Sequence, residues 1–354
     1  MTIETKNIDA EKLIRFSMKA LEKMGVPPED AQLTAEILVA ADLRGVDSHG
    51  VAHLAPFYIQ RIKDKHINVR PQIRVTTNTL STAVVDGDGG LGFVVGYRAM
   101  EDAMKRARDT GCGFVTVNNS THYGAGAYYA MMALSRDMIG ISLTQGGLGV
   151  VAPGSRGRGI GLNVISVAVP AGEEKPFVLD MATGVVAAGK LEIAARNGTP
   201  IPEGWAVDID GNPVTDVSKA SGGILPLGGT PSLGSYKGFG LTVLIDILCS
   251  VLSGDLSVPE MDKATSAKGR SSHFFGALNI AGFMPVQHFK EKMDAMIRAH
   301  HNLPKGPDVD KIRLAGGIEW ETEMERRKLG IPLHPSVLNS LQTLARELNI
   351  EYDL

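Results

Sequence analysis

The sequence predicts a mixed α/β protein in which both ends of the chain form a helical domain beside a larger sheet domain. Residues 1–72 and 288–354 repeat apolar side chains at the spacing of amphipathic helices, whereas residues 73–287 alternate short β-rich runs with helices. No repeat or low-complexity linker separates these parts. We therefore expect one discontinuous helical domain, from residues 1–72 and 288–354, packed on the sheet domain.

The helical ends are predicted from capping residues and apolar spacing. Asp9 is placed to cap a first helix that ends at Gly25. Pro28 starts a second helix, which ends near Gly45, and a third helix contains residues 54–62. Near the C-terminus, the same spacing predicts helices over residues 288–301 and 335–348.

The central part of the chain contains the predicted strands. They cover residues 73–76, 82–85, 113–117, 139–143, 164–169, 177–179 and 276–281. The predicted helices between them cover residues 92–108, 126–135, 185–196 and 237–253. The last of these contains the most apolar run, residues 239–252, which Asp246 interrupts and which is too short to cross a bilayer. We expect it to be a buried helix.

Composition limits the class of partner. Apolar residues make up 44% of the chain and charged residues 21%, as in ordinary soluble proteins, and the net charge is only −3. This balance gives no reason to expect a nucleic acid or an anionic membrane as partner. The two cysteines, Cys112 and Cys249, lie in apolar segments without metal or redox spacing, which predicts a cytoplasmic protein.

Two short segments supply candidate catalytic histidines. His49 lies in Asp-Ser-His-Gly-Val (47–51) and His122 in Ser-Thr-His-Tyr-Gly-Ala-Gly (120–126), each where a loop meets a predicted helix. Imidazole titrates near pH 6.5, so it can take or give a proton at neutral pH. Either histidine alone is as readily a cap or a surface residue. Together they predict an acid–base site.

The glycine run at residues 87–92 matches the dinucleotide fingerprint G-x-G-x-x-G between a predicted strand and a helix. That fingerprint also requires an acidic residue after the next strand, to bind the ribose hydroxyls. Here the strand 113–117 runs into Asn118-Asn119-Ser120, with no Asp or Glu. We therefore interpret the run as a strand-to-helix turn rather than a Rossmann site.

The chain resembles the second type of malate/L-lactate dehydrogenase, which is unrelated to the Rossmann lactate dehydrogenases. Six segments occur in the family's order: 43–51 (LRGVDSHGV), 86–92 (DGDGGLG), 122–124 (HYG), 178–183 (VLDMAT), 201–208 (IPEGWAVD) and 236–241 (YKGFGL). The family includes ureidoglycolate, sulfolactate and malate dehydrogenases, diketogulonate reductase and piperideine-2-carboxylate reductase.

This resemblance implies a large, mostly antiparallel sheet that binds NAD or NADP without a Rossmann fold, and a typical homodimer. It implies hydride transfer between nicotinamide and a small 2-hydroxy or 2-keto acid, or alternatively reduction of a 2-imino acid. His122 matches the histidine taken as acid/base in some members, and His49 matches the one proposed in others. The implied substrate-binding residues are Ser48, His53 and Tyr58. The implied cofactor-binding residues are Asp180, Met181, Ala182, Lys237, Gly238, Gly316 and Gly317, and no metal is expected.

One position departs from the family. Many members carry an arginine four residues after the first histidine, suited to clamp a substrate carboxylate. Here that residue is His53, so carboxylate recognition must be weaker, come from another residue, or serve another group.

Two other classes of protein stay open. One is a metal- or serine-dependent hydrolase or lyase that uses Asp47, His49 and His122, although no G-x-S-x-G or H-E-x-x-H motif occurs. The other is a binding protein in which His53 marks a catalytically inactive site.

Overall fold

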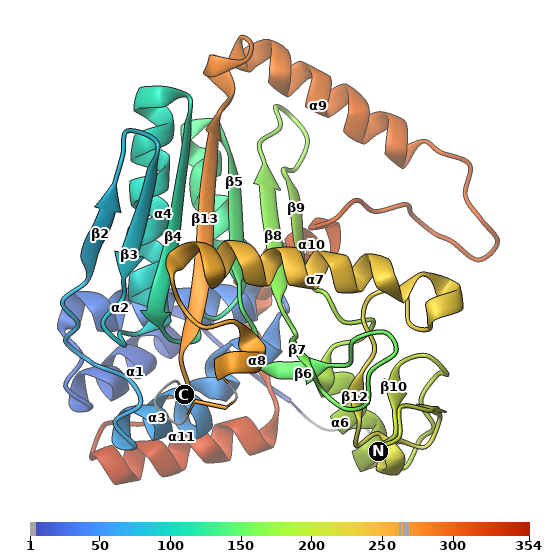
Figure 1. The fold of residues 1–354 in the computed structure, drawn as a ribbon. Helices are drawn as coiled ribbons and strands as arrows, with labels where there is room; N and C mark the ends of the chain where they lie inside the picture. The colour runs from blue at the N-terminus through green and yellow to red at the C-terminus, as the bar shows by residue number, and fades with distance from the viewer. Residues whose placement is uncertain (1–4, 262, 265–268) are drawn as a thin grey trace.

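The computed structural model describes residues 5–261, 263–264 and 269–354. Its centre is a seven-stranded sheet in the order β2-β3-β4-β13-β5-β8-β9 (Figure 1). The strands are β2 (Arg74–Asn78), β3 (Thr82–Asp86), β4 (Cys112–Ser120), β5 (Met138–Thr144), β8 (Val164–Val169), β9 (Phe177–Ala182) and β13 (Ser271–Asn279). Among the described strands of this sheet, only β3 and β4 pair in parallel, so the predicted mixed and mostly antiparallel fold is confirmed.

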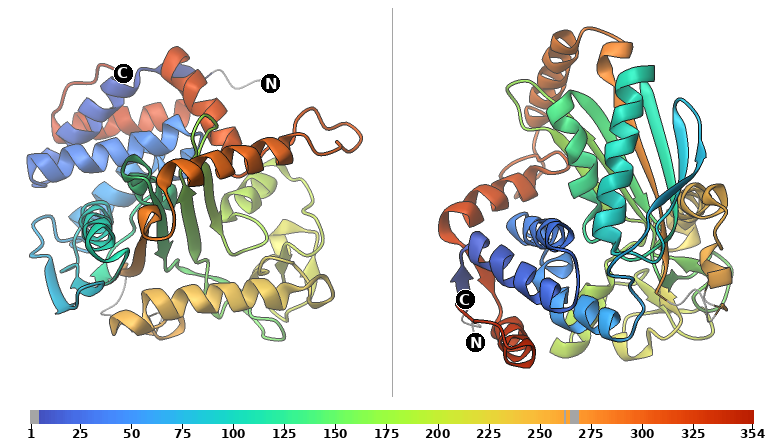
Figure 2. Two further views of the ribbon diagram at one scale, coloured as in Figure 1. Left: turned by 90° about the horizontal axis from the view of Figure 1, so that it is seen from above. Right: turned by 90° about the vertical axis from the view of Figure 1, so that its left-hand side faces the viewer.

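Helices cover both faces of this sheet. Phe275 of β13 packs under α4 (Gly92–Thr110) and α5 (Gly126–Met132), whereas the adjacent Phe274 packs under α7 (Ser235–Cys249) on the opposite face. This alternation follows from the two-residue period of a strand, and Figure 2 shows the helices on the two sides.

The chain ends form a helical layer below the sheet in Figure 1. It contains α1 (Ala10–Lys23), α2 (Pro28–Leu43) and α11 (Pro335–Leu348), and α10 (Gly317–Leu329) contacts α2 and lies behind β9 in Figure 1. β1 (Lys6–Ile8) pairs with β14 (Ile331–Leu333) and joins the two termini. By contrast, α9 (Val286–His301) lies at the far end of the sheet, where Asp294 accepts hydrogen bonds from the backbone of residues 172–174. The domain boundaries at residues 72 and 287 remain a proposal.

A small sheet of five short strands lies beside β9. Its order is β11-β10-β12-β6-β7, formed by β6 (Leu148–Val150), β7 (Ile160–Gly161), β10 (Ala206–Val207), β11 (Pro213–Val214) and β12 (Gly223–Ile224). The remaining helices are α6 (Ala188–Asn197) and α8 (Val258–Met261).

Two sequence predictions of elements were wrong, and one helix was missed. The segment 54–62 is not one α-helix: a π turn, Leu54–Ile59, precedes α3 (Gln60–Lys63), because Pro56 lacks the N–H that an α-helix requires. The helix α10 was missed because it presents no fully buried side chain.

The helix α7 is not buried all round, since Leu244 is 50% and Ile247 46% exposed. With the turn that follows it, Ser235–Ser253 is long and apolar enough to cross a membrane by composition alone, which is weak evidence for a span.

Candidate active site

The two predicted histidines meet at the boundary between the helical layer and the sheet. The rings of His49 and His122 stack with their centroids 5.6 Å apart and their planes at 20°. Nδ1 of His49 lies 2.9 Å from the hydroxyl of Ser48. The Nε2 atom of either ring makes no hydrogen bond with a described residue, so both are available to a small molecule.

The loop that carries His49 is held by a buried carboxyl group that the sequence analysis did not identify. Asp42, at the end of α2, is 1% exposed and accepts a hydrogen bond from the backbone N–H of Val51 at 2.8 Å. A Cβ atom on Gly50 would lie 1.9 Å from its carboxyl oxygen, so only glycine fits there. From α10, Arg326 pairs with Asp47. The loop 47–51 is therefore fixed from two sides.

His122 follows β4 and is oriented by Tyr58. The phenol oxygen lies 2.6 Å from Nδ1, and the backbone N–H of Gly124 donates to the same atom at 3.3 Å. Because a phenol can donate or accept, it suits either tautomer of the imidazole. Tyr58 is fully buried, so the structure places it behind His122, although the resemblance implied a contact with substrate.

The glycine run 87–92 supports His122 from the other side. Gly92 donates its N–H to the hydroxyl of Thr121, and that hydroxyl donates to the carbonyl of Gly90. A Cβ atom on Gly92 would lie 2.1 Å from the carbonyl oxygen of Thr121 and 2.6 Å from that of His122. The run is therefore a turn that packs against the histidine segment, as we interpreted it.

An aromatic wall completes the site. The centre of the Phe57 ring lies 5.3 Å from the ring centre of His122 and 5.5 Å from that of His53. His53 lies 6.3 Å from His49, which brings the family's arginine position into the same cluster. In the described part of the chain, no group of three His, Cys, Asp or Glu side chains could hold a metal ion.

Burial keeps the site's imidazoles neutral at pH 7. It lowers the pKa of His49 to about 4, with His53 adding to the shift. Burial also holds the pKa of His122 well below its usual value, with smaller contributions from the neighbouring histidines and Arg61. A bound anion would oppose both shifts.

Acid should destabilise the fold through these histidines. The pKa of the structural His273 is lowered to about 3 by burial, and that of His49 to about 4, from 6.5. Between pH 6.5 and 4 the unfolded chain binds protons that the folded chain does not, so stability is lost as pH falls. From these two histidines we expect the free energy of unfolding to fall by about 5 kcal/mol over this window. Asp42, whose pKa is raised to about 8, acts in the opposite direction.

Denaturant titrations at each pH measure this effect. His273→Gln should reduce the slope between pH 6.5 and 4, and Asp42→Asn should make it steeper. A stability that does not change from pH 7 to 4 in the wild type and both variants would contradict the assignment of neutral buried histidines.

The residues that match the family's cofactor stretch lie on the edge strand β9. The carboxylate of Asp180 accepts hydrogen bonds from the N–H of Ala127, at the start of α5, at 3.0 Å and from the hydroxyl of Ser166 at 2.5 Å. Met181 and Ala182 follow, half-buried, at the end of the strand. Ala127 lies five residues after His122, so α5 connects this edge to the imidazoles.

Three glycines that match the family's cofactor residues lie near the two ends of the same strand. Gly316 has φ +89°, and a Cβ atom there would lie 2.9 Å from Cβ of Val178. Gly317 is the next residue and begins α10. A Cβ atom on Gly238 would lie 2.3 Å from the carbonyl oxygen of Leu227. The backbone N–H of Leu227 donates to the carbonyl oxygen of Thr183, the residue after β9. The predicted cofactor residues therefore lie along β9, with Gly316 near its start and Gly238 beyond its end.

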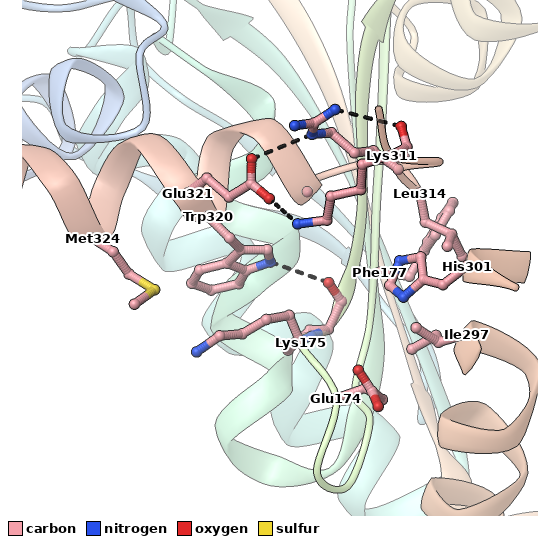
Figure 3. Close-up of a pocket in the computed structure, with 14 residues that line it drawn as sticks. Glu174, Lys175, Phe177, Ile297, His301, Lys311, Leu314, Trp320, Glu321 and Met324 are labelled. Carbon is pink, nitrogen blue, oxygen red and sulfur yellow. Dashed lines mark hydrogen bonds and ion pairs between the residues drawn. The ribbon is translucent and has the colours of Figure 1, made fainter. Parts of the chain in front are cut away.

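Two cavities adjoin this region. One, of about 300 Å³, lies between α2, α5 and α10 and is lined by Val46 and Ala125, each three residues from one of the imidazoles. The other, of about 370 Å³, lies between β9, α9 and the start of α10 (Figure 3). Trp320 forms one wall of the larger cavity, and Lys311 pairs there with Glu321.

Known proteins define the class of this one as a dehydrogenase. Residues 8–342 match the family model for malate/L-lactate dehydrogenase. The malate dehydrogenase of Pyrococcus horikoshii is 44% identical over 348 residues, covering 97% of this chain and 96% of that protein. The L-sulfolactate dehydrogenase of Methanocaldococcus jannaschii is 38% identical over 343 residues, covering 96% of each.

A solved structure agrees with this match. The malate dehydrogenase of Entamoeba histolytica superposes with a TM-score of 0.94 at 32% identity, over 99% of this chain and 100% of that chain. The chain belongs to the malate/L-lactate dehydrogenase family, as the sequence resemblance predicted.

Proposed function

We propose that this protein is a nicotinamide-dependent dehydrogenase that oxidises a small 2-hydroxy acid and reduces the corresponding 2-keto acid. The observation that carries the proposal is the stacked pair of neutral imidazoles, His49 and His122, with both Nε2 atoms available to substrate. The family membership and the names of the relatives support the same chemistry.

His122 acts as the acid/base in this proposal. In oxidation the hydroxyl proton of the acid passes to Nε2 of the His122 tautomer that carries its ring proton on Nδ1 and donates it to the phenol oxygen of Tyr58, and in reduction that proton returns from Nε2. His49 and Ser48 bind the same substrate oxygen or share its proton, and His53 lines the acid's binding site. When bound, the nicotinamide ring accepts or donates the hydride.

The residues along β9 fit a dinucleotide. Lys237 is exposed in the first turn of α7, where a cation is unfavourable unless an anion binds. In the same turn, the buried hydroxyl of Ser235 has no hydrogen-bond partner among the described residues. A phosphate group would satisfy both. Asp180, Met181, Ala182, Gly238, Gly316 and Gly317 would complete the site for NAD or NADP.

The proposed assembly is a cytoplasmic homodimer. Tyr236, Leu244 and Ile247 of α7, with Val251 in the turn after it, form an exposed apolar stripe at helical spacing. A second copy of the chain would bury this stripe. We expect a dimer in sedimentation experiments and a shift to monomer on Leu244→Glu. A wild-type monomer would contradict this part of the proposal.

A substrate panel with both cofactors tests the proposal. We expect malate, lactate, sulfolactate or ureidoglycolate to reduce NAD or NADP, followed by nicotinamide absorbance. A cyclic 2-imino acid with the reduced cofactors tests the imino acid alternative. Cofactor oxidation by the imino acid alone would favour that alternative, and no reaction with any acid would contradict the proposed function.

Tyr58→Phe tests the orienting role of the phenol. Its loss removes one hydrogen bond from His122, worth about 1 kcal/mol, so turnover should fall about five- to tenfold with cofactor affinity unchanged. The control is Tyr97→Phe, since no described residue hydrogen-bonds to that hydroxyl. Equal turnover in the two variants would contradict the role.

A further inference from the structure

A positively charged side chain near His122 has no carboxylate partner among the described residues. The guanidinium carbon of Arg61 lies 4.1 Å from the centre of the Phe57 ring, which lies 5.3 Å from His122. One nitrogen, Nη1, donates to the carbonyl of Gly269 at 3.1 Å. Within the described residues, no Asp or Glu lies within ion-pair distance of Arg61. Two ring contacts thus connect the catalytic imidazole to a half-buried guanidinium.

Such a group is costly to bury unless an anion pairs with it. Burial lowers the pKa of Arg61, and its charge in turn lowers the pKa of His122. A guanidinium has five N–H donors in a planar fork, and Gly269 uses only one nitrogen. The remaining donors match the two oxygens of a carboxylate.

We propose that Arg61 binds the carboxylate of the substrate in place of the arginine that His53 replaces. This inference rests on the proposed function, because it concerns the same 2-hydroxy acid. The acid lies along Phe57 with its 2-oxygen at Nε2 of His122 and its carboxylate at Arg61. The site therefore selects anionic acids over neutral analogues. The cation that selects them, Arg61, belongs to α3, which follows the π turn 54–59.

The test compares a 2-hydroxy acid with its primary amide in three variants. Arg61→Gln removes the charge, Arg61→Lys keeps the charge without the fork, and Arg70→Gln is the matched control on an exposed arginine. We expect Arg61→Gln to raise KM for the acid about 10- to 100-fold and to leave the amide unchanged. Arg61→Lys should be intermediate, and Arg70→Gln should match the wild type. Equal losses for acid and amide would indicate a structural role and overturn the proposal.

Two further measurements separate this proposal from the proposed function. In calorimetry with saturating cofactor, oxalate should bind the wild type and lose affinity for Arg61→Gln, whether or not turnover is seen. Equal oxalate affinity, or no binding by either protein, would overturn the role of Arg61. The double variant Arg61→Gln/His53→Arg should have a lower KM for the acid than Arg61→Gln alone, because it restores a guanidinium at the family's position. A wild type that oxidises no acid but shows Arg61-dependent oxalate binding would contradict only the proposed function.

Discussion

Replacing His122 by alanine is expected to lower turnover by about 10²- to 10⁴-fold, because the substrate hydroxyl loses its proton acceptor. The affinity for NAD or NADP should stay within about twofold of wild type, since the predicted cofactor residues lie on β9, α7 and α10 rather than on the imidazole. Steady-state kinetics and cofactor fluorescence titration measure the two effects separately.

The matched control is His288→Ala, on an exposed face of α9 far from the site. It should turn over like the wild type. His49→Ala should lose less activity than His122→Ala, because Tyr58 and Gly124 orient only His122. Near-normal turnover in His122→Ala would refute the acid/base role.

The second large effect is expected from Gly92→Ala. Its new methyl group would meet the carbonyl oxygens of Thr121 and His122 at 2.1 and 2.6 Å, and both are backbone atoms that cannot rotate away. The free energy of unfolding should fall by about 1–3 kcal/mol. Turnover should also fall, because the backbone of His122 must move. Chemical denaturation and kinetics on the same preparation measure both.

The control for this change is Gly189→Ala, where a Cβ atom would meet nothing within 4 Å. That variant should keep the stability and turnover of the wild type. If Gly92→Ala were as stable and active as Gly189→Ala, the glycine run would not be needed to position His122.

The sequence could predict the sheet because its strands carry clear alternation and its turns carry glycine. β4 extends the predicted strand 113–117 at both ends, whereas β13 begins before the predicted strand 276–281 and ends two residues short of it. The short strands β1 and β14 could not be predicted, since three residues show no period and their pairing joins the two ends of the chain. The exposure of α7 was also hidden, because an apolar helix has the same sequence whether a sheet or a second chain covers it.

Within the site, the histidines were predictable from their motifs, but their supports were not. Asp42 lies in a helix whose apolar pattern gives no sign of a buried carboxyl group. Tyr58 contacts His122, and Arg61 lies over Phe57, after a π turn at Pro56 that changes which side chains share a face. Such contacts depend on tertiary geometry, which local patterns in the sequence do not specify.

The most direct test of the account is the fate of the hydrogen on C2 of the substrate. A 2-hydroxy acid found in the panel is labelled with deuterium at C2 and oxidised by the wild type, and the reduced cofactor is examined by mass spectrometry. We predict that the deuterium is transferred to the nicotinamide ring and that His122→Ala transfers it at least a hundredfold more slowly. Deuterium released to water, or transfer at an equal rate by His122→Ala, would contradict the account.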